Sequence, residues 1–102
     1  MPRMTASVLK VVAALLAAAG DERYGLQLMQ ATGLPSGTLY PILVRLERAG
    51  WVESRWEQTD PAAEGRPARR YYVLTPDGTV EAQREVALMR QQMSPFLGEA
   101  PA

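Results

Sequence analysis

Residues 33–52, GLPSGTLYPILVRLERAGWV, decide the fold that the rest of the sequence completes. The stretch opens with a Pro-Ser-Gly-Thr run, and Ser36 is a residue type that caps helix starts. It closes at Gly50, which can adopt the positive φ found at helix ends. We therefore predict a helix over about residues 36–49, with Ser36 as its N-cap. Its apolar residues have the i, i+3, i+4, i+7 spacing of a buried helical face, and they are Leu39, Ile42, Leu43 and Leu46.

Pro41 is unusual inside this helix, because proline has no N–H and its ring crowds the carbonyl four residues earlier. That carbonyl belongs to Gly37, which has the freedom to move aside. We expect the first turn to open rather than the helix to break, at a local cost of up to ~3 kcal/mol. The distortion would hold Thr38 and Tyr40 in a fixed pose on the side of the helix away from the core.

Two helical segments precede this stretch, over about residues 5–19 and 24–31. The first also resembles a signal peptide, because basic residues precede an apolar run that ends in alanines. The helix interpretation is preferred, since the motif that follows needs this segment for support. The run is also shorter than the roughly 20 residues that cross a bilayer. The expected core residues of the two segments are Val8, Val11, Val12, Leu15, Ala19, Leu26, Leu28 and Met29.

Two strand candidates follow the central helix. Residues 51–58, WVESRWEQ, alternate between two faces, and residues 68–75, ARRYYVLT, end in a run of β-forming side chains. The residues between them are rich in proline, glycine and alanine, so we expect a mobile loop rather than a tight hairpin turn. A last helix is predicted from Thr75, a suitable N-cap, to about Met93.

The order of these elements is three helices, two strands and a final helix. This order predicts an α+β, mainly helical fold: a winged helix-turn-helix with a C-terminal dimerisation helix. We divide the chain into a winged helix-turn-helix DNA-binding domain (residues 1–75), a dimerisation helix (76–94) and a flexible tail (95–102).

Composition limits the chemistry of the chain. Its 102 residues include neither cysteine nor histidine, which excludes disulfides, thiolate sites and the commonest general base. We therefore expect no enzyme activity, no metal site and no cofactor. Glu53 and Glu57 alternate with Arg55, so they are better explained as a salt-bridged solvent face than as a catalytic pair. Eleven basic and eleven acidic residues balance, so a nucleic-acid site would depend on the local distribution of charge.

The polar side of the central helix suits a DNA major groove. A recognition helix reads bases mainly from its N-terminal residues, and Thr38 and the Tyr40 hydroxyl can bond a phosphate or a base edge. Arg45 and Arg48 can bond phosphate, and arginine can also bond guanine at two positions. An ordinary solvent-exposed face explains this helix, taken by itself, equally well.

Three segments together resemble the PadR family of bacterial transcriptional regulators: YGLQLMQATG, GTLYPILVRLERAGWV and GRPARRYYVLT. With the Thr-x-x-Gly start of the last helix, the resemblance covers about residues 5–90. It implies a cytoplasmic, homodimeric repressor that binds an inverted-repeat operator in double-stranded DNA. It also implies a short subgroup with one C-terminal helix, no membrane partner, and repression that is often relieved by a small-molecule inducer, here of unknown identity.

The resemblance also assigns roles to individual residues. Thr38, Tyr40 and Pro41 match the recognition-helix motif of the family. Arg66, Arg69 and Arg70 match its wing. These arginines cluster with only Glu64 nearby to offset them, which suits phosphate neutralisation or insertion into a narrow minor groove. A solvated loop is the alternative. The predicted DNA-binding residues are Ser36, Thr38, Tyr40, Pro41, Arg45, Arg66, Arg69 and Arg70.

The two tryptophans, Trp51 and Trp56, allow two interpretations. They could form a site for a flat aromatic ligand, but such residues more often anchor a hairpin on its helices. We expect both to be anchors.

The last helix is expected to pair with a second copy of the chain. Its apolar residues recur at steps of four, three and four, as in a short heptad seam. A two-fold dimer would place two recognition helices about one DNA turn apart. Some family members stack flat drugs on an aromatic residue of this helix, but here it has methionines and no Trp or Tyr, so such a site is not expected. The predicted interface residues are Leu9, Leu16, Ala82, Val86, Met89 and Met93.

A protein-interaction module that ignores DNA is the second hypothesis. The neutral net charge is its best support. Binding to DNA at low salt distinguishes the two hypotheses, because a positively charged DNA-binding surface is strongest there.

Overall fold

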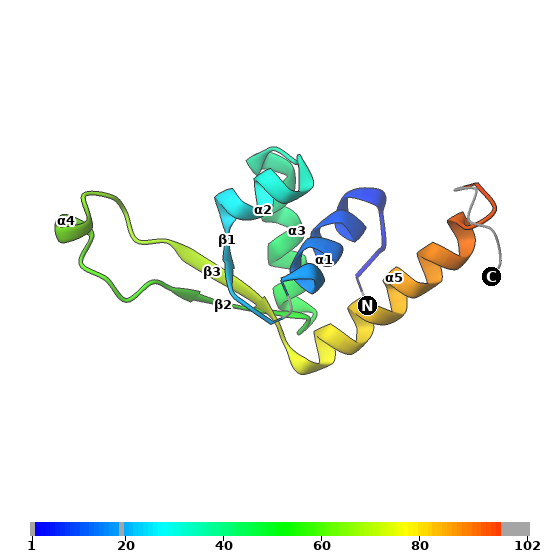
Figure 1. Ribbon diagram of the computed structural model, residues 1–102. Helices are drawn as coiled ribbons and strands as arrows, with labels where there is room; N and C mark the ends of the chain where they lie inside the picture. The colour runs from blue at the N-terminus through cyan, green and yellow to red at the C-terminus, as the bar shows by residue number, and fades with distance from the viewer. Residues whose placement is uncertain (1, 19, 97–102) are drawn as a thin grey trace.

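The computed structural model describes residues 2–18 and 20–96 and has the winged helix-turn-helix fold (Figure 1). Three helices form a body, and a small antiparallel sheet and a last helix extend from it. Ala19 and residues 97–102 of the predicted tail lie outside the described residues. The elements, in chain order, are α1 (Ala6–Ala17), β1 (Arg23–Tyr24), α2 (Gly25–Thr32), α3 (Ser36–Arg48), β2 (Val52–Trp56), α4 (Pro61–Glu64), β3 (Arg70–Leu74) and α5 (Pro76–Met93).

The core confirms the apolar faces predicted for α1 and α3. Every member of those two faces that the structure describes is at most 4 % exposed, and each such side chain contributes about 1.5–3 kcal/mol on burial. Leu28 of α2 is also buried, and Met29 packs against the core from its edge. The prediction for Leu26 is wrong: its side chain is 53 % exposed. An eight-residue helix is too short for periodicity to identify its buried side.

The start of α3 differs from the prediction by one residue. Pro35, rather than Ser36, is the N-cap, and its carbonyl accepts hydrogen bonds from the N–H groups of Thr38 and Leu39, both at 3.0 Å. Pro41 lies within the helix without breaking it, as predicted. The fixed φ of Pro35 suits the extended conformation of an N-cap, so proline can replace the side-chain cap expected from serine.

The sheet contains one strand that the sequence did not indicate. β3 lies in the centre, with β1 and β2 antiparallel to it on either side, and Arg23 and Tyr24 of β1 pair with Tyr72 and Tyr71. The segment that includes β1 was expected to be a turn. A two-residue strand has no measurable alternation, so pairing with β3 is what defines it.

The hairpin formed by β2, β3 and the connection between them is called the wing below. Figure 1 shows the wing and α5 extending from opposite sides of the three-helix body. The wing connection was expected to be a mobile loop, but it contains α4 at its tip. Asp60 caps α4 by accepting a hydrogen bond from the Ala62 N–H at 3.0 Å, and Gly65 ends the helix with a φ of 68°. These are local capping interactions, so four residues suffice for one helical turn.

α5 begins at the predicted N-cap. The Thr75 hydroxyl accepts from the Gly78 N–H at 2.9 Å and donates to the Gly50 carbonyl at 2.7 Å. Gly78 lies directly against the backbone carbonyl of Trp51, leaving no space there for a Cβ. This contact joins the segment between α3 and β2 to the start of α5. None of the described helices is both long and apolar enough to cross a membrane.

Candidate nucleic-acid interface

The polar side of α3 is open to solvent. Ser36, Pro41 and Arg45 are exposed, Thr38 is half-buried, and Tyr40 is 41 % exposed. Arg45 folds back along the helix, where its Nε donates to the Pro41 carbonyl at 3.3 Å. This side therefore combines hydroxyl groups, a guanidinium and the free N-terminal N–H groups of a helix, all of which can bond phosphate.

Tyr40 has a structural contact that the sequence did not reveal. Its hydroxyl end lies against Gly25, the first residue of α2, so closely that a Cβ at Gly25 would overlap it. Tyr40 thus braces the first turns of α3 against the start of α2. Gly25 is a candidate functional residue missed by the sequence analysis. The only available signal was the Tyr24-Gly25 pair, whose physical reason is this close approach.

The guanidinium of Arg66 forms a bidentate ion pair with Glu57. Its Nη1 lies 2.7 Å from Oε1 and its Nη2 lies 3.1 Å from Oε2. The Tyr71 hydroxyl also donates to Glu57, at 3.0 Å. The hydrogen bonds from Arg66 lower the pKa of Glu57 to about 2, with a further contribution from Tyr71. The expectation that only Glu64 would offset the wing arginines is therefore wrong, because Glu57 reaches Arg66 across the wing.

Arg69 and Arg70 each contact an aromatic ring. The Arg69 guanidinium lies 4.2 Å from the ring centre of Tyr24, and the Arg70 guanidinium lies 5.2 Å from that of Trp56. Arg70 also donates to Ser54 at 2.7 Å and approaches Glu47 at 3.7 Å. Among the described residues Arg69 makes no ion pair. It is therefore the wing arginine whose charge is least compensated.

The face of β2 that contains Arg55 forms salt bridges, as predicted, but the partners come from other segments of the chain. Arg55 pairs with Glu22 at 2.6 Å, and its guanidinium lies 5.4 Å from the Tyr71 ring centre. Because Glu57 pairs with Arg66, the two acidic residues of the strand region do not act together. Within residues 2–18 and 20–96, no cluster of His, Cys, Asp or Glu could hold a metal ion.

A cleft of about 620 Å³ lies between α3, the start of α2 and the wing. We call it the wing cleft. It brings together Tyr40 and all three predicted wing arginines, whereas the other predicted α3 residues lie outside it. Its lining residues are Tyr24, Gly25, Leu26, Tyr40, Trp56, Arg66, Pro67, Ala68, Arg69, Arg70 and Tyr72.

The two tryptophans occupy different environments. Trp51 is 5 % exposed and belongs to the core, as predicted for an anchor. Trp56 is 58 % exposed and faces the wing cleft, so the prediction that it anchors the hairpin is wrong. Its strand extends beyond the helical body at this point, so alternation places Trp56 on the core-facing side of the sheet where there is no core.

The residues predicted for the dimer interface fall into two groups. Met89 and Met93 are 40 % and 36 % exposed, and Leu9, Leu16 and Val86 are half-buried. Ala82 is fully buried in the core of its own protomer and so offers no surface to a second copy. Its small side chain lets α5 approach α1 closely. Further apolar residues at the surface of α5 and beyond it are Val80, Leu88 and Phe96.

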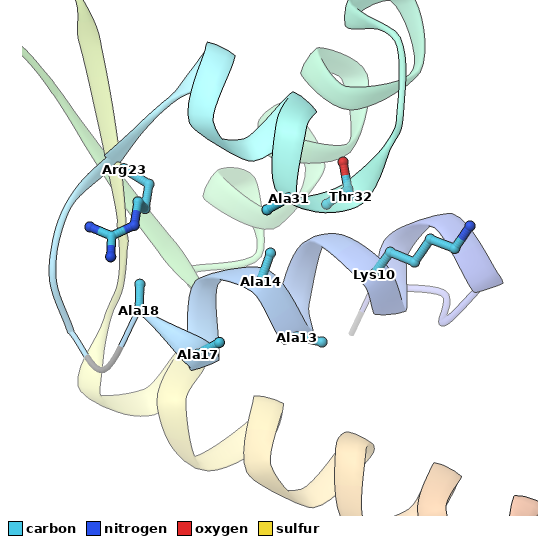
Figure 2. A pocket seen from close by; sticks show the side chains of 8 residues that line it. All are labelled: Lys10, Ala13, Ala14, Ala17, Ala18, Arg23, Ala31 and Thr32. Atoms are coloured by element: carbon cyan, nitrogen blue, oxygen red, sulfur yellow. The ribbon is translucent and has the colours of Figure 1, made fainter. Parts of the chain in front are cut away.

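A second cavity, of about 600 Å³, lies between α1 and α2 (Figure 2). Five alanine side chains form most of its lining, and Figure 2 shows Lys10 toward one end and Arg23 toward the other. Thr32 supplies its remaining polar group. The lining has neither an acid nor a strong nucleophile, so this alanine groove offers packing surface rather than chemistry.

Comparison with known proteins identifies a family. The sequence matches the model of the Transcriptional regulator PadR-like family over residues 14–84, which is more than half of the chain. No protein of the curated set matches it significantly.

Several solved structures resemble the chain. The protein smu.1704 from Streptococcus mutans UA159 is 25% identical, with a TM-score of 0.68, over 99% of this chain and 98% of that one. A PadR-like transcription factor from Bacteroides fragilis is 24% identical, with a TM-score of 0.66, over 90% of this chain and 89% of that one. BpsR of Bordetella bronchiseptica, whose DNA binding is regulated by 6-hydroxynicotinic acid, is 22% identical, with a TM-score of 0.74, over 97% of this chain and 66% of that one. These two lower identities support the fold alone.

Proposed function

The chain belongs to the PadR-like family of transcriptional regulators, and we propose that it is a repressor that binds a specific operator as a homodimer. The observation that carries the proposal is the meeting of Tyr40 with the wing arginines at the wing cleft. Residues far apart in the sequence, each of a type that binds DNA, thereby line one cleft between α3 and the wing.

α3 is the proposed reader of the operator. Its 13 residues span about 20 Å, and a helix of this kind fits the major groove, which is about 12 Å wide. Ser36 and Thr38 lie in its first turn, where recognition helices contact bases. Arg45 lies two turns further on and is proposed to bond a phosphate.

The start of β3, rather than the tip of the wing, is the proposed backbone contact. Arg69 and Arg70 lie there and line the wing cleft together with Tyr40. The tip includes Asp60 and Glu64, both exposed, which would repel phosphates. The arrangement favours phosphate contacts beside the major groove over insertion of the tip into the minor groove.

The proposed dimer uses α5 and the adjacent surface of α1. Leu88 and Met89 of α5 are exposed beside Leu9 of α1, and a second copy would cover them. A two-fold arrangement matches an inverted-repeat operator, because symmetric half-sites require symmetric readers. The substitution Leu88→Glu should shift the protein from dimer to monomer in sedimentation equilibrium, whereas Glu64→Gln, exposed at the tip of the wing, should leave the dimer intact.

The experiment that tests the function is selection of bound duplexes from a random pool, followed by fluorescence anisotropy with the selected sequence. We expect affinity to exceed that for random DNA and to fall steeply with salt. Arg45→Gln should weaken binding, whereas Arg84→Gln on α5 should not. Transcription of a reporter with the operator in its promoter would fall when the protein is expressed. Equal affinity for selected and random DNA would contradict the proposal.

The alternative, a protein-interaction module without DNA binding, makes the opposite prediction in the same assay. Such a module would leave the duplex unbound even at low salt and would co-purify with a fixed partner. The absence of net charge supports it. The uncompensated Arg69 beside the exposed side of α3 favours DNA.

A further inference from the structure

Trp56 is an exposed tryptophan outside the hydrophobic core, and the Arg70 guanidinium lies 5.2 Å from its ring centre. It is 58 % exposed and lines the wing cleft together with the exposed Tyr40, the half-buried Tyr24 and the buried Tyr72. Large exposed aromatic residues gathered at one concave surface are typical of binding sites. A DNA duplex presents phosphates and base edges to a protein, but its base faces are stacked inside the helix. The proposed operator would therefore leave the ring faces of the cleft unused.

The same cleft contains one arginine without a carboxylate partner. Glu57 pairs with Arg66, and Glu47 lies 3.7 Å from Arg70, so among the three arginines of the cleft Arg69 is the one that makes no ion pair with a described residue. The Tyr24 ring holds the Arg69 guanidinium in place at 4.2 Å. The N-cap and first residue of α2, Tyr24 and Gly25, also line the cleft, and the partial positive charge of a helix N-terminus favours an anion nearby.

We propose that the wing cleft binds a free, flat aromatic ring that bears a phosphate group, a ligand about the size of a mononucleotide. The exposed ring of Trp56 would stack against the flat ring of the ligand. Arg69 would bond its phosphate, since the planar guanidinium matches phosphate oxygens in a two-point contact. The cleft volume, about 620 Å³, lies within the range of sites for small organic ligands.

This ligand would compete with the operator, a consequence that rests on the proposed function. Tyr40 and Arg69 belong both to the cleft and to the proposed DNA surface. A phosphate already bound at Arg69 would exclude the DNA phosphate and repel its neighbours. The cleft would thus be a regulatory site at the DNA surface, formed within one protomer rather than between two.

The direct test is isothermal titration calorimetry of the full chain without DNA. Adenosine 5′-monophosphate is compared with adenosine, which lacks the phosphate, and with inorganic phosphate, which lacks the ring. A second set, 2-naphthyl phosphate and 2-naphthol, tests whether a ring without hydrogen-bonding groups suffices. We expect at least one aromatic phosphate to bind about tenfold more tightly than its ring alone and than phosphate alone. The ring alone lacks the charge-assisted hydrogen bonds of the phosphate, and phosphate alone lacks the stacking of the ring.

Variants locate the site. Arg69→Gln should weaken the aromatic phosphate about tenfold without affecting the phosphate-free ring, and Trp56→Ala should weaken both. Arg84→Gln, on exposed α5, is the matched control and should bind as the wild type does. Circular dichroism melting confirms that each variant is folded. The proposal would be overturned if neither aromatic phosphate bound more tightly than its ring alone and phosphate alone. It would also be overturned if wild type, Arg69→Gln and Trp56→Ala bound the aromatic phosphate equally.

A competition experiment separates this inference from the proposed function. In anisotropy, the aromatic phosphate should release bound operator, and the phosphate-free ring should not. If the protein binds no duplex in the absence of ligand, the proposed function fails, while calorimetry still decides the ligand site. If the duplex binds and the ligand leaves that binding unchanged despite occupying the cleft, competition is contradicted.

Discussion

α3 and the wing present their polar side chains in opposite ways. The exposed side of α3 has few contacts with other segments of the protein: Ser36 and Pro41 are exposed, and Arg45 bonds the Pro41 carbonyl of its own helix. The wing arginines are instead held by contacts within the protein, Arg66 by Glu57 and Arg69 by the Tyr24 ring. A side chain held before binding loses less entropy on binding, but a side chain in an ion pair must exchange one partner for another. The wing therefore favours fixed geometry, and α3 favours adaptable contacts.

Both regions depend on the junction at Gly78, so the largest expected effect comes from breaking it. In Gly78→Ala the new Cβ would overlap the Trp51 carbonyl, and rigid backbone on both sides leaves little room to adjust. We expect a loss of about 3 kcal/mol in the free energy of unfolding, measured by urea denaturation. Gly37→Ala is the matched control, because its Cβ would meet open space and alanine favours a helix interior. Equal stability of the two variants would contradict the close contact.

The second effect concerns the brace that links the two regions through Tyr40. In Gly25→Ala the Cβ would displace the Tyr40 hydroxyl, which lies at the end of a side chain that can rotate away. We expect a smaller loss of stability, about 1–2 kcal/mol, and weaker operator binding because Tyr40 leaves its position. Adding Tyr40→Leu should restore stability to the Gly25→Ala protein, since the overlap disappears. Additive losses in this double-mutant cycle would show that the two residues do not interact.

The third comparison tests whether a held arginine binds DNA more weakly when it already has a carboxylate partner. Arg69→Gln should lower the slope of log affinity against log salt by about 1, the value for one phosphate contact. Arg66→Gln should lower it less, because Glu57 competes with DNA for the Arg66 guanidinium. Anisotropy titrations at several salt concentrations provide the slopes. Equal slopes for the two variants would remove the distinction between the arginines.

The fourth effect is a pH dependence confined to the wing. The pKa of Glu57 is lowered from 4.5 to about 2 by its hydrogen bonds, first of all from Arg66. A depressed pKa in the folded state means that this stabilisation is fully present above about pH 4.5 and is lost as the pH falls toward 2. Glu57→Gln should lower the melting temperature at neutral pH, with a difference from wild type that shrinks between pH 4.5 and 2. Glu64→Gln, at an exposed position of the same wing, is the matched control. A constant difference for Glu57→Gln would contradict the assignment.

The smallest expected effect is on α3 itself. Pro41→Ala restores an N–H to the helix, so stability should stay the same or rise by about 1 kcal/mol. If the proline holds the first turn in a fixed pose for DNA, operator affinity should fall several-fold despite the firmer helix. Unfolding and anisotropy measurements on the same preparation separate the two effects. Unchanged affinity would mean that Pro41 has only a local role in packing.

The sequence was sufficient for features that depend on neighbouring residues. The apolar period of α1 and α3 identified their buried sides, because a helix repeats every 3.6 residues whatever its surroundings. Thr75 identified the start of α5, because its cap bond to the Gly78 N–H lies within one helical turn. Together these features were enough to predict a winged helix-turn-helix. The DNA-binding residues were predicted by type and by family resemblance, and they remain predictions.

Only the tertiary structure decided what lies between distant segments. Whether Trp56 is buried depends on how far the helical body reaches along β2. The alternation of residues within the strand does not predict how far that is. The partner of Arg66 is Glu57, nine residues away along the chain, and Tyr40 meets Gly25 because α2 and α3 pack together. Periodicity describes one element at a time, whereas these contacts exist only after the elements pack. For the same reason, the sequence named the wing arginines but not the cleft in which they meet Tyr40.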